Sequence, residues 1–117
     1  MEIGTGTGVK GQKWYVTNTW DGYITLKNGL GYYLDIQYGR KDDGTNVQTY
    51  TANGADAQKF KPIASSQAGA YGILTKCSSD SKALDVYNFG TTDGSNVCQW
   101  SYYQNRNQLW IFEPCAN

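Results

Sequence analysis

Histidine is absent from the 117 residues of this chain. Its absence removes the usual general base of hydrolases, the commonest metal ligand and any Ser-His-Asp triad. The three cysteines, Cys77, Cys98 and Cys115, follow no zinc-binding spacing. The sequence therefore predicts no metal and no cofactor, and an enzyme of this sequence would have to work with carboxylates alone.

Net charge and long apolar runs are also lacking. Lys and Arg number 10, as do Asp and Glu, so we expect no nucleic-acid partner, because such binding needs a basic face. No stretch approaches the roughly 18 apolar residues of a membrane-spanning helix. Residues 1–5 show neither the basic segment nor the apolar run of a signal peptide, so we expect any export signal to lie outside this sequence.

The length fits a single domain over residues 1–117, and an internal repeat runs through it. Five short blocks of sequence recur at an offset of 50 residues. They are Leu34-Asp35-Ile36 with Leu84-Asp85-Val86, Asp43-Gly44 with Asp93-Gly94, Asn46-Val47 with Asn96-Val97, Tyr50 with Trp100, and Gln58-Lys59-Phe60 with Gln108-Leu109-Trp110. A partial further copy ends in Gln12-Lys13-Trp14. Residues 1–14 therefore form the tail of a first repeat, 15–64 a second and 65–117 a third.

Each complete copy has the pattern of four short strands. In the third repeat we expect them at 71–76, 83–87, 96–101 and 108–112. The segments between them are rich in Gly, Asn, Asp and Ser, as turns are, and no stretch has helical periodicity over three turns. The chain is predicted to be all-β.

A four-stranded repeat of this length that closes with Gln-x-aromatic resembles the ricin B-type lectin repeat, including the family-thirteen carbohydrate-binding modules. The resemblance covers essentially the whole chain and implies a β-trefoil. Gln12, Gln58, Trp14, Phe60 and Trp110 then belong to the structural motif, with the three aromatic rings directed inward.

The first repeat lacks its first two strands by this comparison. Three explanations stay open: a truncated sequence, strands supplied by another chain through strand exchange or oligomerisation, or an altered fold.

The resemblance also implies sugar pockets, one for each complete repeat. An aromatic ring stacks on a pyranose, while a carboxylate and amides hold its hydroxyls. In the third repeat these positions are Asp85, Trp100, Asn107 and Gln108, with Tyr87 and Phe89 as candidates for a second wall. Cys98 stands where a pocket glutamine is common.

In the second repeat the pocket positions are Asp35, Gln48 and Tyr50, with Tyr38 as its candidate second wall. Ala57 occupies the asparagine position, and either Asp56 or Asn53 could replace the missing amide. Gln58 could equally tie the fold together through backbone hydrogen bonds.

The expected function is non-catalytic binding of galactosides, xylan, arabinan or galactan, as a secreted lectin or a targeting module of a secreted glycoside hydrolase. The alternative is a protein-binding trefoil such as a protease inhibitor. The disulfide positions usual in the family are Ala83 and about Ser101 here, so that bridge is missing. Cys77 with Cys98 is a candidate pair, which would leave Cys115 over.

Overall fold

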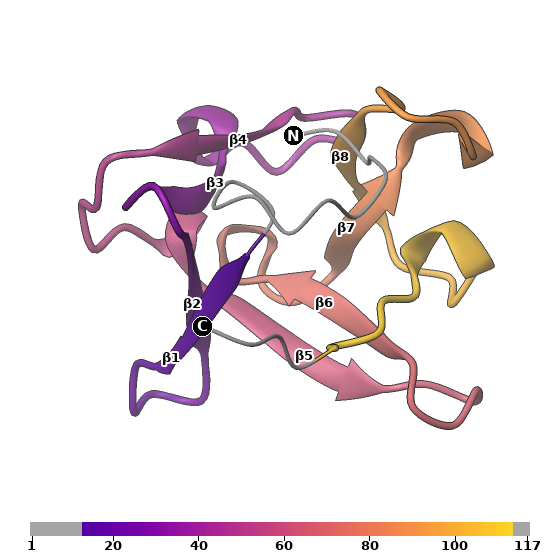
Figure 1. Ribbon diagram of the computed structural model, residues 1–117, viewed down its shortest axis with the longest axis horizontal. Helices are drawn as coiled ribbons and strands as arrows, with labels where there is room; N and C mark the ends of the chain where they lie inside the picture. The colour runs from indigo at the N-terminus through magenta and orange to yellow at the C-terminus, as the bar shows by residue number, and fades with distance from the viewer. Residues whose placement is uncertain (1–12, 114–117) are drawn as a thin grey trace.

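The computed structural model describes residues 13–113, which form eight strands joined by turns and short 3₁₀ helices (Figure 1). The strands are β1 (Trp14–Asn18), β2 (Ile24–Asn28), β3 (Tyr33–Ile36), β4 (Val47–Tyr50), β5 (Phe60–Ala64), β6 (Tyr71–Thr75), β7 (Lys82–Val86) and β8 (Val97–Ser101). The 3₁₀ helices are η2 (Gln37–Gly39), η3 (Asp56–Gln58), η4 (Lys76–Ser78), η5 (Tyr87–Phe89) and η6 (Arg106–Gln108). The all-β prediction is confirmed.

Every strand pairing is antiparallel, and the pairings repeat along the chain. The hairpins β1–β2 and β5–β6 make the barrel wall. Single bridges join Ile24 to Phe60 and Tyr71 to Trp110, so the two complete repeats close on themselves in the same way. The hairpins β3–β4 and β7–β8 lie at one end of the barrel strands in Figure 1.

Corresponding residues of the two complete repeats take the same places in the hairpins. Asp35 pairs with Gln48 across β3 and β4, and Asp85 pairs with Cys98 across β7 and β8. Because the side-chain period of a strand is two residues, this shared register puts the two aspartates on equivalent faces of their hairpins.

The core forms where the barrel strands meet the hairpins. Its buried side chains are Leu26, Leu34, Ile36, Val47, Ala57, Phe60, Ile73, Leu84 and Val97. Phe60 is fully buried, whereas Trp14 and Trp110, at the two equivalent positions, are partly buried against the same cluster. The prediction that these three rings point inward is confirmed, and removing the Phe60 ring should cost about 3–5 kcal/mol of stability.

Three of the four strands expected in the third repeat are confirmed to within a residue or two. The fourth is wrong, because Gln108 lies in η6 and only Trp110 makes a β-bridge. Gln108 turns its side chain to neighbouring backbone groups, which holds this segment in a turn. No helix within residues 13–113 has the length and apolar character needed to cross a membrane.

Candidate functional site

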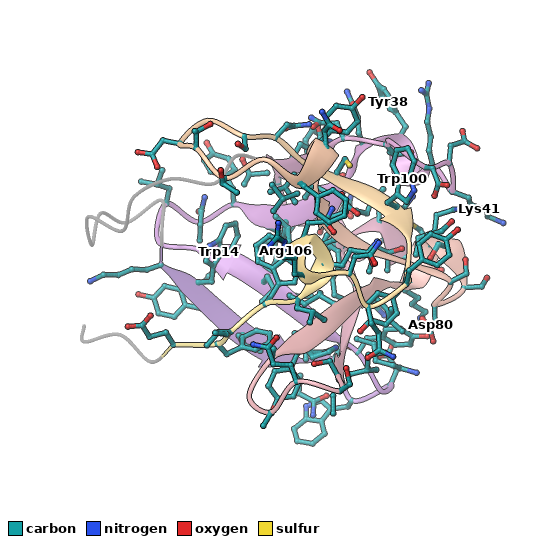
Figure 2. The ribbon with its side chains drawn as sticks, turned by 90° about the vertical axis from the view of Figure 1, so that its right-hand side faces the viewer. Trp14, Tyr38, Lys41, Asp80, Trp100 and Arg106 are labelled. Carbon is teal, nitrogen blue, oxygen red and sulfur yellow. The ribbon has the colours of Figure 1, made fainter. Side chains whose placement is uncertain are left out.

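Two pockets lie at equivalent places in the two complete repeats. The first, the Asp35 pocket, has a volume of about 660 Å³, and the second, the Asp85 pocket, about 300 Å³. The Asp35 pocket is lined chiefly by Asp35, Tyr38, Gln48, Tyr50, Asn53, Asp56 and Ala57. The Asp85 pocket is lined by Asp85, Tyr87, Asn88, Phe89, Trp100, Tyr103, Asn105, Asn107 and Gln108. Figure 2 shows Tyr38 of the first pocket and Trp100 of the second on the same half of the molecule, away from Trp14.

Two glutamines hold the Asp35 carboxylate. Gln48 Nε2 donates to Oδ1 at 3.1 Å, and Gln58 Nε2 donates to Oδ2 at 2.9 Å. Gln58 also donates to the Thr51 carbonyl and accepts from the Asn53 backbone N–H. Gln58 therefore ties the last turn of the repeat to the strand that carries the acid, which is the structural role considered for it from the sequence.

The Asp85 carboxylate is held in a similar way from a different set of residues. Gln108 Nε2 donates to Oδ2 at 3.0 Å, and Asn107 Nδ2 donates to Oδ1 at 3.2 Å. Asn107 also donates to the Val86 carbonyl. The Cys98 sulfur lies 4.0 Å from Oδ1, in the place that Gln48 takes in the other pocket.

In both pockets an amide donates to Oδ1 of the aspartate, but the amide comes from a different element in each. In the Asp35 pocket it comes from β4, and position 57 is an alanine. In the Asp85 pocket it comes from η6, and position 98 is a cysteine. Each carboxylate oxygen accepts one amide, which fixes its direction and leaves lone pairs for a ligand hydroxyl.

Burial in the hairpin raises the pKa of Asp85, and the amides of Gln108 and Asn107 only partly oppose this. A carboxylate that is 6% exposed, beside an aromatic ring, is a strong acceptor at a site with little competing water. The site can therefore accept hydrogen bonds from hydroxyl groups while a ring stacks on the apolar face of their carrier.

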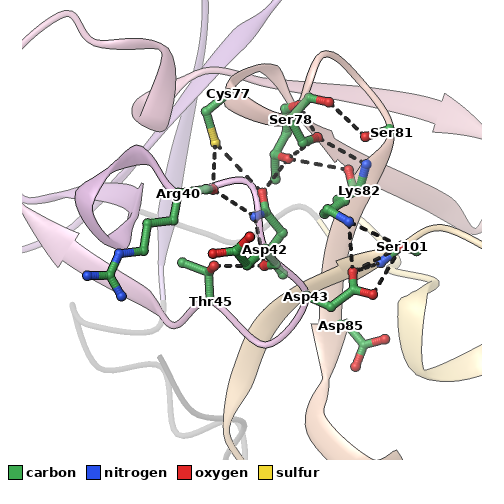
Figure 3. Close-up of polar contacts among 12 residues, drawn as sticks. Arg40, Asp42, Asp43, Thr45, Cys77, Ser78, Ser81, Lys82, Asp85 and Ser101 are labelled. Carbon is green, nitrogen blue, oxygen red and sulfur yellow. Dashed lines mark hydrogen bonds and ion pairs between the residues drawn. The ribbon is translucent and has the colours of Figure 1, made fainter.

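Trp100 is the aromatic platform of the Asp85 pocket, with 36% of its surface exposed. Its ring packs over the turn of the preceding repeat, since a Cβ added to Gly44 would lie 3.7 Å from it. Asp43 in that turn accepts from the Ser101 backbone N–H at 2.7 Å and forms an ion pair with Lys82 at 3.0 Å (Figure 3). The second repeat therefore braces the pocket of the third.

The second wall of each pocket comes from a turn with left-handed backbone. Tyr38 and Gly39 have φ of 57° and 60°, and Asn88 and Phe89 each have φ of 54°. Such values strain residues that carry a side chain. The turn sets Tyr38 and Phe89 on the pocket rims, where both were considered from the sequence. The Arg40 guanidinium stacks on the Tyr38 ring at 5.2 Å.

All eight sugar-site residues predicted from the sequence line the pockets. Asp35, Gln48 and Tyr50 line the first, and Asp85, Tyr87, Trp100, Asn107 and Gln108 line the second. Tyr103, Asn105 and Lys41 also line the pockets but were not predicted from the sequence. Tyr103 and Asn105 stand 50 residues after Asn53 and Ala55, so the repeat offset could have located them. Gln12 lies outside the described residues.

The suggested disulfide between Cys77 and Cys98 is wrong, because both thiols are free. The two thiols lie in different surroundings. The Cys77 sulfur lies near the Arg40 backbone carbonyl and the Gln99 side-chain oxygen (Figure 3), and the Cys98 sulfur faces Asp85. Burial raises the pKa of the Cys98 thiol to about 11, so it stays protonated at neutral pH. Cys115 lies outside the described residues.

Comparison with protein families identifies the family of this chain. The family model described as ricin-type β-trefoil lectin domain-like matches residues 10–100. The chain belongs to this family. The predicted β-trefoil is therefore confirmed, whereas most of the first repeat, residues 1–12, lies outside the described residues. A comparison with curated proteins gives no significant match.

Solved structures with the same fold include natural proteins and a designed one. A designed three-fold symmetric protein, ThreeFoil, is 34% identical, with a TM-score of 0.85 over 92% of this chain and 76% of its own. An exo-β-1,3-galactanase from Clostridium thermocellum is 32% identical, with a TM-score of 0.84 over 92% of this chain. This chain spans 23% of the galactanase. A Macrolepiota procera ricin B-like lectin, solved with lactose, shares the fold at 23% identity, with a TM-score of 0.80 over 92% of this chain and 74% of its own.

Proposed function

We propose that this ricin-type domain binds glycans without catalysing a reaction on them, through the Asp85 and Asp35 pockets. The observation that carries the proposal is the Asp85 carboxylate, held by amides on both oxygens beside the half-exposed Trp100 ring. A pyranose presents an apolar C–H face and a rim of hydroxyls, and this pairing of ring and acid is complementary to both.

The proposed ligands are galactose-containing glycans, with plant cell-wall polysaccharides such as galactan, arabinan and xylan as the wider class. The similarity to a galactanase domain at 32% identity supports galactose. It also supports a role as a targeting module, secreted together with a glycoside hydrolase. A single pocket of this kind should bind a monosaccharide with a dissociation constant of about 1 mM, which corresponds to a binding free energy of roughly −4 kcal/mol.

A catalytic function is not favoured by the arrangement of the acids. Hydrolysis of a glycosidic bond uses two carboxyl groups about 5–10 Å apart on either side of it. Asp35 and Asp85 line separate pockets, and each is already held by two amides. Asp56, the second carboxylate of the Asp35 pocket, forms an ion pair with Lys76 at 3.5 Å. We therefore propose binding alone.

The test is replacement of Trp100 by alanine, followed by titration with galactose, lactose and soluble galactan. We expect the affinity of the Asp85 pocket to fall at least tenfold, about 1.4 kcal/mol, with the circular dichroism spectrum unchanged. Trp20→Ala is the matched control, because Trp20 is 89% exposed and lines neither pocket. Equal binding by both variants would refute the pocket, and cleavage of galactan by the unaltered chain would refute the non-catalytic role.

A further inference from the structure

The two pockets share a motif but differ in charge. Lys41 lines the Asp35 pocket, whereas the residue 50 positions later is Thr91, which does not line the Asp85 pocket. Among the described residues, Asp85 is the only charged residue that lines its own pocket. A cation therefore stands at one of the two sites and has no counterpart at the other.

The Lys41 ammonium has no counter-ion in the structure. Within residues 13–113 it forms no ion pair, hydrogen bond or ring contact. The two acids that line the same pocket have partners of their own, because two amides hold Asp35 and Asp56 pairs with Lys76 at 3.5 Å. Asp42, the next residue in the chain, does not line the pocket. An uncompensated cation at the wall of a pocket favours an anionic ligand.

The backbone that carries Lys41 is held on both sides of it. The fully buried Gln99 donates from Nε2 to the Arg40 carbonyl at 2.9 Å and to the Asp42 carbonyl at 3.3 Å. The Thr45 hydroxyl also donates to the Asp42 carbonyl, at 2.7 Å. A ligand that pairs with Lys41 therefore meets an ordered segment and does not have to order it on binding.

The Asp35 pocket has room for more than one sugar unit. Its volume is about 660 Å³, against about 300 Å³ for the Asp85 pocket. When Asp35 and Tyr50 hold one pyranose, space remains within the wall to which Lys41 belongs. Figure 2 shows Lys41 on the same side of the molecule as Tyr38, the candidate second wall of this pocket.

We propose that the Asp35 pocket binds an acidic glycan, in which a galactose unit at Asp35 carries a second sugar whose carboxylate pairs with Lys41. The inference rests on the proposed function, because Asp35 must hold the galactose. A carboxylate accepts charge-assisted hydrogen bonds from an ammonium group, and both uronic acids and sialic acids present one. The Arg40 guanidinium, which stacks on the Tyr38 ring at 5.2 Å, adds a second positive charge at the rim.

The test compares two disaccharides of the same linkage, glucuronosyl-galactose and glucosyl-galactose, which differ in the charge of the second sugar. Each is titrated by NMR into Trp100→Ala, which leaves the Asp35 pocket to bind. We expect the acidic disaccharide to bind about two- to fivefold more tightly at low salt, the range of an exposed ion pair. The advantage should vanish at about 0.5 M NaCl, because salt screens exposed charges. Sialyllactose, measured against lactose, tests sialic acid in the same way.

Lys41→Gln, introduced into Trp100→Ala, should bring the ratio of the acidic to the neutral affinity close to one. Lys27→Gln is the matched control, because it removes the same charge from a residue of β2 that lines neither pocket. It should keep the ratio. Tyr50→Ala, which leaves the Asp85 pocket to bind, should show no preference for the acidic sugar.

The outcomes separate this inference from the proposed function. If Trp100→Ala binds both acidic sugars no better than their neutral partners, the acidic preference is overturned and glycan binding stands. If it binds none of the four sugars, both proposals fail at this pocket. A preference that survives Lys41→Gln overturns the role of Lys41. A gain for one acidic sugar alone supports the proposal and identifies which acid, uronic or sialic, the pocket accepts.

Discussion

At the scale of single residues, the two pockets hold the same carboxylate oxygen with amides from different elements. Gln48 does so in the Asp35 pocket and Asn107 in the Asp85 pocket. Asn107→Ala should leave one oxygen of Asp85 without its donor. Because hydrogen bonds to charged groups contribute about 1.5–3 kcal/mol, we expect the affinity of that pocket for galactose to fall about tenfold by calorimetry.

A double variant tests whether the amide itself matters, rather than the position that supplies it. Cys98 stands where Gln48 stands in the other repeat, so Asn107→Ala combined with Cys98→Gln should return an amide to Asp85 Oδ1 and recover part of the lost affinity. Cys98→Ala in place of Cys98→Gln is the control. If it rescues binding equally, the amide is not what orients the carboxylate.

The raised pKa of Asp85 predicts how the same pocket responds to acid. Because burial raises the pKa of this carboxyl above its ordinary value, it takes up a proton before an exposed aspartate does as the pH falls toward 4. The protonated form loses an acceptor, so glycan affinity at this pocket should drop there. Galactose titrations at pH 7, 5 and 4, followed by tryptophan fluorescence and compared with those of Trp100→Ala, measure this loss of affinity.

We expect the chain to stay folded at the pH at which glycan binding at the Asp85 pocket is lost. A raised folded pKa means that protonation of Asp85 favours the folded state, so this group adds stability as the pH falls. A hydrogen bond from Lys59 holds the pKa of Asp21 far below its usual range. The stability from Asp21 is present above the unfolded pKa and is lost only as the pH falls through that lowered value. Unfolding that coincides with the loss of binding at pH 4 would contradict this order.

At the scale of elements, the turn at Asp43-Gly44 is a joint between repeats. Asp43 holds both the Ser101 backbone and the Lys82 ammonium (Figure 3). Gly44 lies beside the Trp100 ring. Burial raises the pKa of Asp43, but its hydrogen bonds from Lys82 and Ser101 outweigh this and lower it. The carboxylate therefore stays ionised while it braces the pocket.

Asp43→Ala should therefore affect both stability and binding. Loss of these hydrogen bonds from a partly exposed site should cost about 1–2 kcal/mol of unfolding free energy in urea. The affinity of the Asp85 pocket should fall as well, although Asp43 does not line it. Asp42→Ala is the neighbouring control, for which we expect neither change.

The repeat predicted much of these elements. The offset of 50 residues paired Asp35 with Asp85 and Tyr50 with Trp100, and strand period and register place each pair on equivalent faces. The resemblance to the ricin B-type repeat identified these as pocket positions and implied inward rings at Trp14, Phe60 and Trp110.

The features that the sequence did not predict are contacts between repeats and details of the turns. The contact of Gly44 with Trp100 joins residues 56 positions apart, and no local pattern encodes it. The 3₁₀ helix η6 replaced the expected start of a strand at Gln108, because its buried amide satisfies the turn backbone. The transfer of an amide from position 98 to position 107 became visible only when the two pockets were compared.

At the scale of the whole molecule, the two pockets differ although their motifs match. The Asp35 pocket has the larger volume, and its platform Tyr50 is 54% exposed against 36% for Trp100. Trp100 has the turn at Gly44 beside it, whereas no turn of a first repeat stands beside Tyr50 among residues 13–113. The Asp35 pocket is therefore the more open of the two, and we expect it to be the weaker for a monosaccharide.

Two weak pockets on one rigid body should act together on a long ligand. When one pocket has bound a polysaccharide, the second meets neighbouring sugar units at a high effective concentration, and the apparent affinity rises by about 10²–10⁴ if both can engage one chain. Tyr50→Ala should thus lower the affinity for galactan by far more than it lowers the affinity for galactose. Its control is Tyr15→Ala, which removes a similarly exposed ring outside both pockets.

Calorimetry separates the loss of one pocket from the loss of joint binding. The stoichiometry of galactose binding counts the pockets, and the affinity for galactan reports whether they act together. The unaltered chain should bind two galactose molecules, Tyr50→Ala and Trp100→Ala one each, and the double variant none. Both single variants should hold galactan with little more than single-pocket affinity. If either single variant retains the full affinity for galactan, the pockets do not engage one chain together, and each must be treated as an independent site.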